Sequence, residues 1–199
     1  MKKFTISSIN HHIGGVYEKY LKKSLDSLEG DFDVIFSNYG KEASKKYNEF
    51  IEKCETPYLI ITHQDVSFSS DLLKRIEETI NDFPEFGAIG MVGVDSNHEY
   101  RWSGPKVYEV DTLDSCFIVI RLDLGIKFDE INFDEVHCST EDYCAQLRNI
   151  GRNIYTIKIP EGSLLTHHSQ TCSTEGFCWG NYRIYRNKFQ QKWPNLKTT

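Results

Sequence analysis

Asp65 is the carboxylate whose position most clearly suggests chemistry. It lies just beyond the apolar run 58–62, separated from it by His63 and Gln64. A carboxylate at the mouth of a buried strand can hold a hard divalent cation together with phosphate oxygens. We therefore treat Asp65 as a candidate metal ligand, with His63 and Gln64 as neighbours that could bind the same ligand. The alternative is that Asp65 only shapes a turn ahead of the next helix.

Two further pairs of reactive side chains occur in the second half of the sequence. Glu141 and Asp142 stand at the expected start of a helix, where one could act as a general base or both could only cap the helix. His167 and His168 follow a short apolar stretch, and an imidazole there could bind a metal or hydrogen-bond within the protein. Each place lies at the end of an expected element, so the fold decides whether these groups can act together.

Polar residues also follow the first two expected strands. Ser8 and Asn10 come at the end of the first, and Ser37 and Asn38 at the end of the second. Ligands of open α/β sheets bind beyond the carboxyl ends of the strands, so these residues are candidates for contacts to a nucleotide. The competing interpretation is that strands run into polar loops in any case.

Hydrophobic periodicity predicts the elements that must position these residues. In the first half, strands and helices alternate: strands at 4–9, 33–36, 58–62 and 87–94, and helices at 17–28, 43–54 and 72–83, the last with Asp71 as N-cap. In the second half, we expect strands at 106–110, 115–120, 154–159 and 163–166, and a helix at 142–150. The nearly all-apolar strand 58–62 is typical of a parallel sheet that helices cover on both faces.

These elements predict one α/β domain over residues 1–199, built on an open sheet with right-handed crossovers. Within it we expect a nucleotide-binding half at about 1–95 and a less regular half at about 96–199. The 199 residues are 39% hydrophobic and 26% charged, which is typical of an ordinary globular domain.

The charge balance narrows the class of partner. Lys plus Arg total 23 against 29 for Asp plus Glu, a net charge of −6. Such a balance argues against nucleic-acid binding, which normally needs a basic patch. An acidic protein that handles phosphates must offset their charge locally, with a metal ion, helix N-termini or backbone amides.

The sequence contains no stretch of the roughly 20 apolar residues that a membrane span needs, and its first residues lack an apolar signal core. We therefore expect a cytoplasmic protein, either free or peripheral at the inner face of the membrane. Its cysteines are then expected to be reduced. Cys138 and Cys144 with His137 and His167 offer zinc ligands, but their spacings match no common template.

A further set of motifs runs through most of the chain in a characteristic order. They are the strand 4–10, Ala43 with Tyr47 and Asn48, 59–66 with His63-Gln64-Asp65, 87–90, 110–114, 128–130, 141–144 with Gly151, and 167–169. Together they resemble the small bacterial branch of family 2 glycosyltransferases, in which His-Gln-Asp stands in place of Asp-x-Asp. The resemblance implies the GT-A fold, an open mixed sheet with helices on both faces.

The same resemblance implies an activity and its cofactor. It implies transfer of a sugar from a nucleotide-diphosphate donor, most often a UDP-sugar, to a glycan or glycolipid acceptor. It also implies Mn²⁺ or Mg²⁺ on the diphosphate. Asp65 corresponds to the metal-binding carboxylate, and His167, or alternatively His168, to the late histidine that completes metal or diphosphate binding.

The remaining roles are implied in the same way. Asp142 matches the general base, Glu141 a residue that orients the base or the acceptor, and Asp114 a position near the donor sugar or the acceptor. One base without a second, nucleophilic carboxylate is what inversion at the anomeric carbon requires. Trp102 and Trp179 could stack on a sugar or serve in packing.

The chain also departs from the family pattern. His63 replaces the first carboxylate of Asp-x-Asp, and a Gln-x-x-Arg-Trp motif is missing, which disfavours a processive polymer synthase. Two other classes of function stay open. One is a non-catalytic module that binds a nucleotide sugar or a glycan, and the other is a nucleotidyltransferase. The latter lacks its expected phosphate loop, since Gly14-Gly15 has no Lys or Arg close enough to serve.

Overall fold

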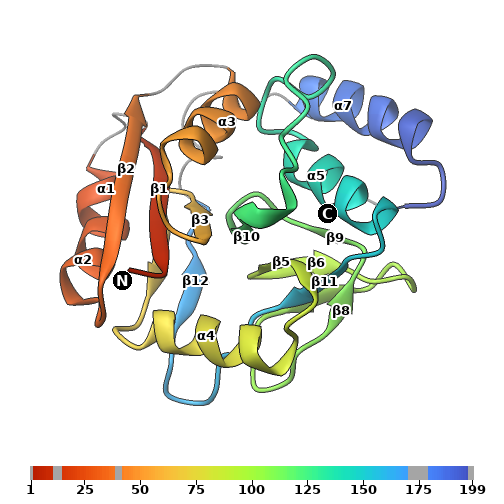
Figure 1. Cartoon of the computed structure of the whole chain (residues 1–199). Coiled ribbons are helices and arrows are strands. Elements are labelled where there is room, and N and C mark those ends of the chain that lie inside the picture. Colours follow the sequence, from red (N-terminus) through yellow and green to blue (C-terminus); the bar gives the residue numbers. More distant parts are fainter. Residues whose placement is uncertain (1, 11–14, 39–41, 170–178, 197–199) are drawn as a thin grey trace.

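The computed structural model describes residues 2–10, 15–38, 42–169 and 179–196, and a mixed sheet of seven strands forms its centre (Figure 1). The strands lie in the order β2-β1-β3-β10-β5-β11-β8. Their bounds are β1 Phe4–Asn10, β2 Phe32–Asn38, β3 Tyr58–Thr62, β5 Phe86–Gly90, β8 Glu109–Val110, β10 Phe117–Arg121 and β11 Asn153–Thr156. The expected open α/β sheet is thereby confirmed.

The order of the strands departs from simple alternation. β1 pairs in parallel with both β2 and β3, so three strands end at the same edge of the sheet. β10 then lies antiparallel between β3 and β5, and β11 runs parallel to β5. A strand from the second half of the chain therefore separates two strands of the first half.

Two small sheets extend the centre. One pairs β4 (Val66–Phe68) with β12 (Leu165–His167), and the other has the order β7-β6-β9, with bounds Tyr100–Trp102, Val92–Val94 and Thr112–Leu113. The predicted strand 87–94 is thus two strands in two sheets. They part at Met91, whose carbonyl accepts a hydrogen bond from the Ser103 amide at 2.6 Å while its own amide donates to Phe117.

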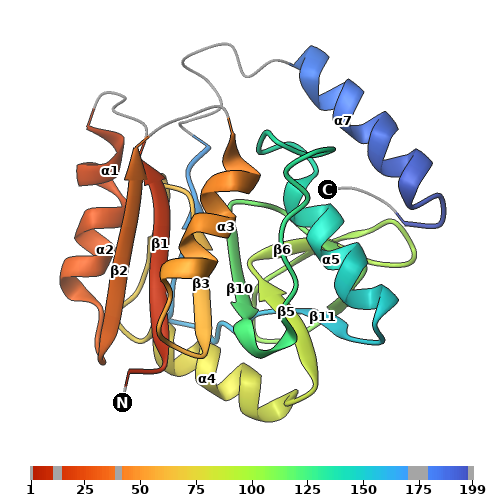
Figure 2. The ribbon, with the colours of Figure 1, turned by 45° about the horizontal axis from the view of Figure 1, so that its top comes forward.

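Helices cover both faces of the sheet (Figures 1 and 2). They are α1 Val16–Lys19, α2 Leu21–Ser27, α3 Ala43–Lys53, α4 Leu72–Asp82, the 3₁₀ turn η1 Leu122–Leu124, α5 Ser139–Asn149 and α7 Trp179–Lys192. The single helix predicted at 17–28 is broken at Tyr20, because the next amide, that of Leu21, turns toward the Gln64 carbonyl at 3.4 Å. Among the described helices, none is long and apolar enough to cross a membrane.

The apolar strand β3 supplies both faces of the core. Ile60 packs in the cluster that includes α4, and Leu59 and Ile61 pack in the cluster that includes Tyr47 and Leu147 of α3 and α5. All three isoleucine and leucine side chains are fully buried. This confirms the expectation that the strand is covered on both sides. A third cluster joins α7 to α5, so the last helix packs outside the main layers.

Asp71 precedes α4 as predicted, but its carboxylate makes no cap hydrogen bond to the helix. It accepts hydrogen bonds from Ser69, Arg75 and Ser163 at 2.6 to 2.7 Å, and these contacts, the Ser69 bond first, lower its pKa to about 2 although partial burial opposes them. Ser69 also exchanges backbone and side-chain hydrogen bonds with Leu164. The start of α4 is thereby joined to the segment that leads into β12.

The tight approach of β6 to β9 yields a first prediction. A Cβ atom on Gly93 would lie 2.3 Å from the Thr112 carbonyl oxygen and 2.8 Å from a Val110 methyl group. We expect Gly93→Ala to lower the free energy of unfolding by about 1–3 kcal/mol, measured by urea denaturation. The control is Gly104→Ala, whose new atom has its nearest neighbour at 4.0 Å. Equal stability of the two variants would contradict this packing.

Candidate functional site

A turn at the end of β3 buries Asp65. The His63 amide donates to the Cys116 carbonyl at 2.9 Å, and the Val66 amide closes the turn on the His63 carbonyl at 3.4 Å. Asp65 is completely buried there, at the carboxyl edge where β1, β2 and β3 end together. A buried carboxylate at this edge needs a partner that offsets its charge.

His167 is that partner, and the pairing of β12 with β4 brings it there. In this register His167 lies opposite Val66, and the His168 amide donates to the Asp65 carbonyl at 2.9 Å. The His167 Nε2 atom consequently lies 3.3 Å from Asp65 Oδ1, although the two residues are far apart in the sequence. The structure thus unites two of the sequence-predicted residues.

His63 completes a group with metal-binding character. Its ring meets the His167 ring edge-on with centroids 5.5 Å apart, and one ligand atom from each of His63, Asp65 and His167 lies within 4.8 Å of the others. Across the described ranges of the chain, this is the one such group of three. Two imidazoles and a carboxylate suit a divalent ion, so the residues present fit the cofactor that the resemblance implies.

The other proposed ligands lie elsewhere. The thiols of Cys138 and Cys144 are buried in separate apolar clusters, and burial raises the pKa of each thiol. His168 stacks on Tyr20 with ring centroids 4.0 Å apart and places its Nε2 atom 3.0 Å from the Ser67 hydroxyl. Of the two adjacent histidines, His167 is therefore the one in the metal-binding group.

The charge of Asp65 governs the protonation of His167. Burial alone would lower the His167 pKa, but the Asp65 carboxylate, with help from Asp114, outweighs it and raises the pKa above its ordinary value. In the absence of a metal, the Asp65 carboxylate therefore favours the protonated form of the His167 imidazole. A cation that binds here competes with that proton.

Asp114 connects this group to the rest of the site. Its Oδ1 atom accepts the Cys116 amide at 2.7 Å and so holds the turn between β9 and β10. Its negative charge contributes to raising the pKa of His167, and, after burial, that of the Cys116 thiol and the Tyr47 phenol. Asp114 thus lies within electrostatic reach of groups on β12, on α3 and in the turn before β10.

Glu141 reaches the same neighbourhood from α5. Its charge and that of Asp114 both contribute to raising the Tyr47 pKa, with burial as the main cause. Glu141 is 5% exposed. The charges of Asp114 and Glu141 therefore both act on the buried Tyr47 phenol of α3, which the periodicity of the sequence identifies only as a core residue.

Asp142 makes a different set of contacts. Its Oδ1 atom accepts the Trp193 indole N–H at 2.7 Å and lies 2.8 Å from Lys192 Nζ, and its Oδ2 atom accepts Gln146 at 2.9 Å. Lys192 also pairs with Asp129 at 2.8 Å. Both oxygens of this fully buried carboxylate are thus engaged, two of the donors coming from the end of α7 and the residue after it. Sequence reasoning missed these donors, because nothing local marks them.

The polar residues expected at the first two strand ends lie at the same edge of the sheet. Asn10 is opposite Asn38 in the β1–β2 register, and Ser8 is two residues before Asn10. Ser8 is fully buried, and its hydroxyl has no hydrogen-bond partner within the described part of the chain. Gln64, also buried, lies in the turn beside Asp65. Whether these side chains contact a nucleotide stays a prediction.

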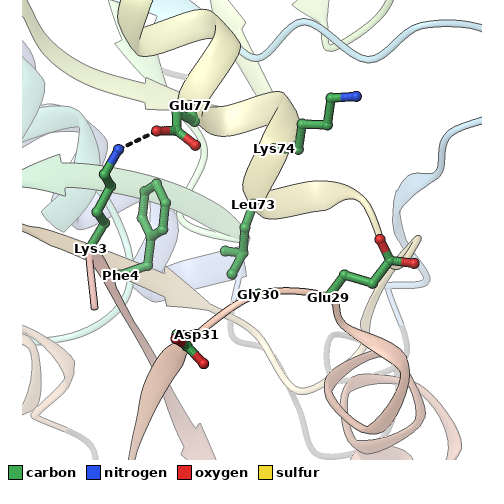
Figure 3. A pocket seen from close by; sticks show the side chains of 8 residues that line it. All are labelled: Lys3, Phe4, Glu29, Gly30, Asp31, Leu73, Lys74 and Glu77. Atoms are coloured by element: carbon green, nitrogen blue, oxygen red, sulfur yellow. Dashed lines mark hydrogen bonds and ion pairs between the residues drawn. The ribbon is translucent and has the colours of Figure 1, made fainter. Parts of the chain in front are cut away.

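A pocket of about 360 Å³ lies at the opposite edge, near the amino ends of β1 and β2 (Figure 3). Its charged lining holds three carboxylates and two lysines: Glu29, Asp31, Glu77, Lys3 and Lys74. One of the lysines is paired with one of the carboxylates. The excess of negative charge makes this pocket a poor place for a diphosphate, and it lies away from the edge where α/β sheets bind ligands.

Comparison with known proteins shows the fold. No protein-family model matches the sequence, and no curated protein matches it significantly. A mannosyltransferase from Pyrobaculum calidifontis, solved with GDP-Man and Mn²⁺, is similar with a TM-score of 0.63 at 12% identity, over 99% of this chain and 66% of that one. GalNAc-T7, solved with UDP, GalNAc and Mn²⁺, is similar with a TM-score of 0.61 at 7% identity, over 84% and 44%. S. aureus TarS 1–349 reaches 0.53 at 11% identity, over 94% and 65%.

These similarities confirm the expected fold class. The chain has the mixed α/β architecture of GT-A glycosyltransferases, with a seven-stranded sheet between helices. It spans between 44% and 66% of the length of these three proteins. At sequence identities this low, the similarity shows a shared fold and does not identify the substrates of this protein.

The ion pair in the site gives a prediction with a defined sign. In the presence of a chelator, we expect NMR titration to give His167 a pKa above 6.5, and Asp65→Asn to bring it below 6.5 because burial then acts with less opposition. In the parent protein, the contribution of His167 to stability is fully present below the unfolded pKa of about 6.5 and is lost as the pH rises through the folded pKa. A raised pKa that persists in Asp65→Asn would contradict this assignment.

Proposed function

We propose that this protein is a metal-dependent, inverting glycosyltransferase that moves a sugar from a nucleotide-diphosphate donor to a glycan or glycolipid. The observation that supports this most is the convergence of His63, Asp65 and His167 at the carboxyl edge of a GT-A-like sheet. Two distant stretches of chain meet there, with Asp114 and Glu141 in the same electrostatic neighbourhood. The resemblance noted in the sequence favours a UDP-sugar, and the cytoplasmic site of action stays the expectation drawn from the apolar pattern of the sequence.

In this proposal, Asp65 and His167 bind the divalent ion, Mn²⁺ or Mg²⁺, and His63 assists. When bound, such an ion stabilises the negative charge that develops on the departing nucleotide diphosphate. The protein itself, at a net charge of −6, has little else to offset that charge. Ser8, Asn10, Asn38 and Gln64 would then contact the nucleotide along the strand ends.

The reaction is a single displacement. The acceptor hydroxyl oxygen attacks the anomeric carbon, and the bond from that carbon to the phosphate oxygen breaks with its electron pair on the leaving diphosphate. The hydroxyl proton passes to a carboxylate of the Glu141–Asp142 pair, within about 3 Å of the attacking oxygen. In this proposal, Asp114 would position the donor sugar or the acceptor. Attack from the face opposite the leaving group inverts the anomeric centre.

The contacts favour different tasks for the two carboxylates of the pair. The resemblance implies Asp142 as the base, but its oxygens already accept Trp193, Lys192 and Gln146. Glu141 is the carboxylate whose charge reaches Tyr47. We therefore assign proton acceptance to Glu141 and the anchoring of α7 to Asp142.

Nucleotide binding tests the metal site. We expect Asp65→Ala to weaken UDP binding in the presence of Mn²⁺ by at least about tenfold, measured by isothermal titration calorimetry. With a chelator, parent and variant should bind UDP alike, because the metal-dependent part is then gone from both. The matched control is Asp31→Ala at the opposite edge, which should retain metal-enhanced binding. Mn²⁺-independent UDP binding by the parent would remove the proposed role of Asp65.

Donor hydrolysis tests the base. We expect Glu141→Gln to lower the turnover of UDP-sugars by about 10²–10⁴ without weakening UDP binding, because a positioned proton acceptor contributes that much. Asp142→Asn should cost less, since it loosens α7 and leaves Glu141 in place. A larger loss of turnover in Asp142→Asn than in Glu141→Gln would show that Asp142 is the base. Binding of UDP-sugars without turnover of any of them, by the parent protein, would favour the non-catalytic module.

A further inference from the structure

Two aromatic side chains are exposed on the short strand β7. Tyr100 and Trp102 are 60% and 59% exposed, and Arg101 between them is half-buried. Alternate residues of a strand point to the same face and lie about 6.5–7 Å apart, so the two rings share one face of β7. Among the large apolar side chains that the described ranges expose, they are the one pair of aromatic rings on a single strand.

The hairpin that carries these rings is held in place from its other face. β7 pairs over its full length with β6. The Arg101 side chain points away from the rings, donates to Asp95 Oδ2 at 2.6 Å, and lies 5.1 Å from the centroid of the Tyr108 ring. Asp95 Oδ1 in turn accepts the amides of Asn97 and Glu99 at 2.9 and 3.1 Å. The strand is therefore already ordered before a ligand binds, which lowers the cost of binding.

The strand lies near the candidate site. Trp102 is opposite Val92 in the β6–β7 register, and the Val92 carbonyl accepts the Asp114 amide at 2.9 Å. Because adjacent strands lie about 4.8 Å apart, the backbones of Trp102 and Asp114 are roughly 10 Å from each other. In the proposed function, Asp114 positions the donor sugar or the acceptor. An acceptor glycan of two or three units that reacts beside Asp114 is long enough to reach Trp102.

The size and charge of this surface favour a sugar as its ligand. A stable protein interface buries about 800 Å² on each partner, whereas two rings at this exposure offer no more than about 300 Å². The exposed carboxylate of Glu99 beside them disfavours a nucleic acid, which needs a basic groove. A pyranose presents C–H bonds to the electron-rich face of an aromatic ring, and the exposed polar turn 96–99 offers hydrogen bonds to its hydroxyl groups.

We infer that Tyr100 and Trp102 form a stacking platform for the acceptor, and that this acceptor carries an oligosaccharide of at least two units at its reacting end. The inference rests on the proposed function for the role of the glycan as acceptor, but binding of a glycan to β7 does not depend on it. The platform contacts sugar units away from the reacting bond, so it binds substrate and transition state alike. It therefore lowers the KM for the acceptor and leaves kcat unchanged.

Glycan binding to the whole chain, without donor or metal, tests the platform. The probes are neutral oligosaccharides of one to four units of glucose, galactose, mannose or N-acetylglucosamine, and saturation-transfer NMR measures their binding. We expect at least one series to bind, with an affinity that rises about tenfold from one unit to three. Trp102→Ala and Tyr100→Ala should each weaken this binding by about three- to tenfold, whereas Trp102→Phe keeps a ring and should retain most of it.

The matched control is Ile184→Ala on α7, which removes an apolar side chain of similar exposure, 55%, and should leave glycan binding unchanged. Circular dichroism checks that each variant is folded. In a transfer assay, Trp102→Ala should raise the KM for the oligosaccharide by the same factor as it weakens binding, with kcat and donor hydrolysis unchanged.

Three results would overturn the inference. They are failure of every oligosaccharide to bind, unchanged binding in both alanine variants, and an unchanged acceptor KM in Trp102→Ala. Binding to vesicles of phosphatidylcholine and phosphatidylglycerol that Trp102→Ala abolishes, without glycan binding, would replace the glycan by a membrane surface. Ring-dependent glycan binding by a parent protein that neither binds UDP nor hydrolyses UDP-sugars would support the platform and contradict the proposed function.

Discussion

The candidate site depends on one short antiparallel pairing, that of β4 with β12. Only three residue pairs make it, yet it sets His167 against Asp65 and so offsets a carboxylate that is completely buried. An uncompensated charge at this depth would cost several kcal/mol, so the end of the main sheet and the late strand stabilise each other. Ser69, bonded to both Asp71 and Leu164, extends this support to the start of α4. The same contacts that close the fold therefore shape the metal-binding group.

Local patterns predict the elements well and their arrangement less well. The apolar run at β3 marks a strand covered on both faces, and the stripe of α3 marks its helix within one residue of the observed end. Periodicity does not reveal that β10 inserts between β3 and β5, because strand order is decided by contacts between distant segments. The break at Tyr20 escapes prediction for the same reason, since the Gln64 carbonyl that turns the Leu21 amide lies on another element.

In the site, too, the local sequence predicts which residues are candidates, whereas contacts with distant segments decide what each one touches. Asp65 is recognisable because it follows a buried strand, and Glu141 and Asp142 because they open a helix. Their tasks are not recognisable locally, since successive helical residues point about 100° apart and face different neighbours. The charge of Glu141 adds to the burial that raises the pKa of Tyr47 on α3, whereas Asp142 accepts hydrogen bonds from Trp193 and Lys192. The resemblance assigns roles by motif, whereas the contacts show only that the two carboxylates have different partners.

The attachment of α7 at Asp142 also has an evolutionary consequence. Lys192 and Trp193 neutralise and saturate a carboxylate that is shielded from water, so the loss of either leaves a buried charge with too few donors. A substitution at Asp142, Lys192 or Trp193 is therefore tolerated only if the other two residues change to match it. Among homologous chains, residues 142, 192 and 193 are expected to covary. A homologue without a carboxylate at position 142 should also lack the lysine at position 192.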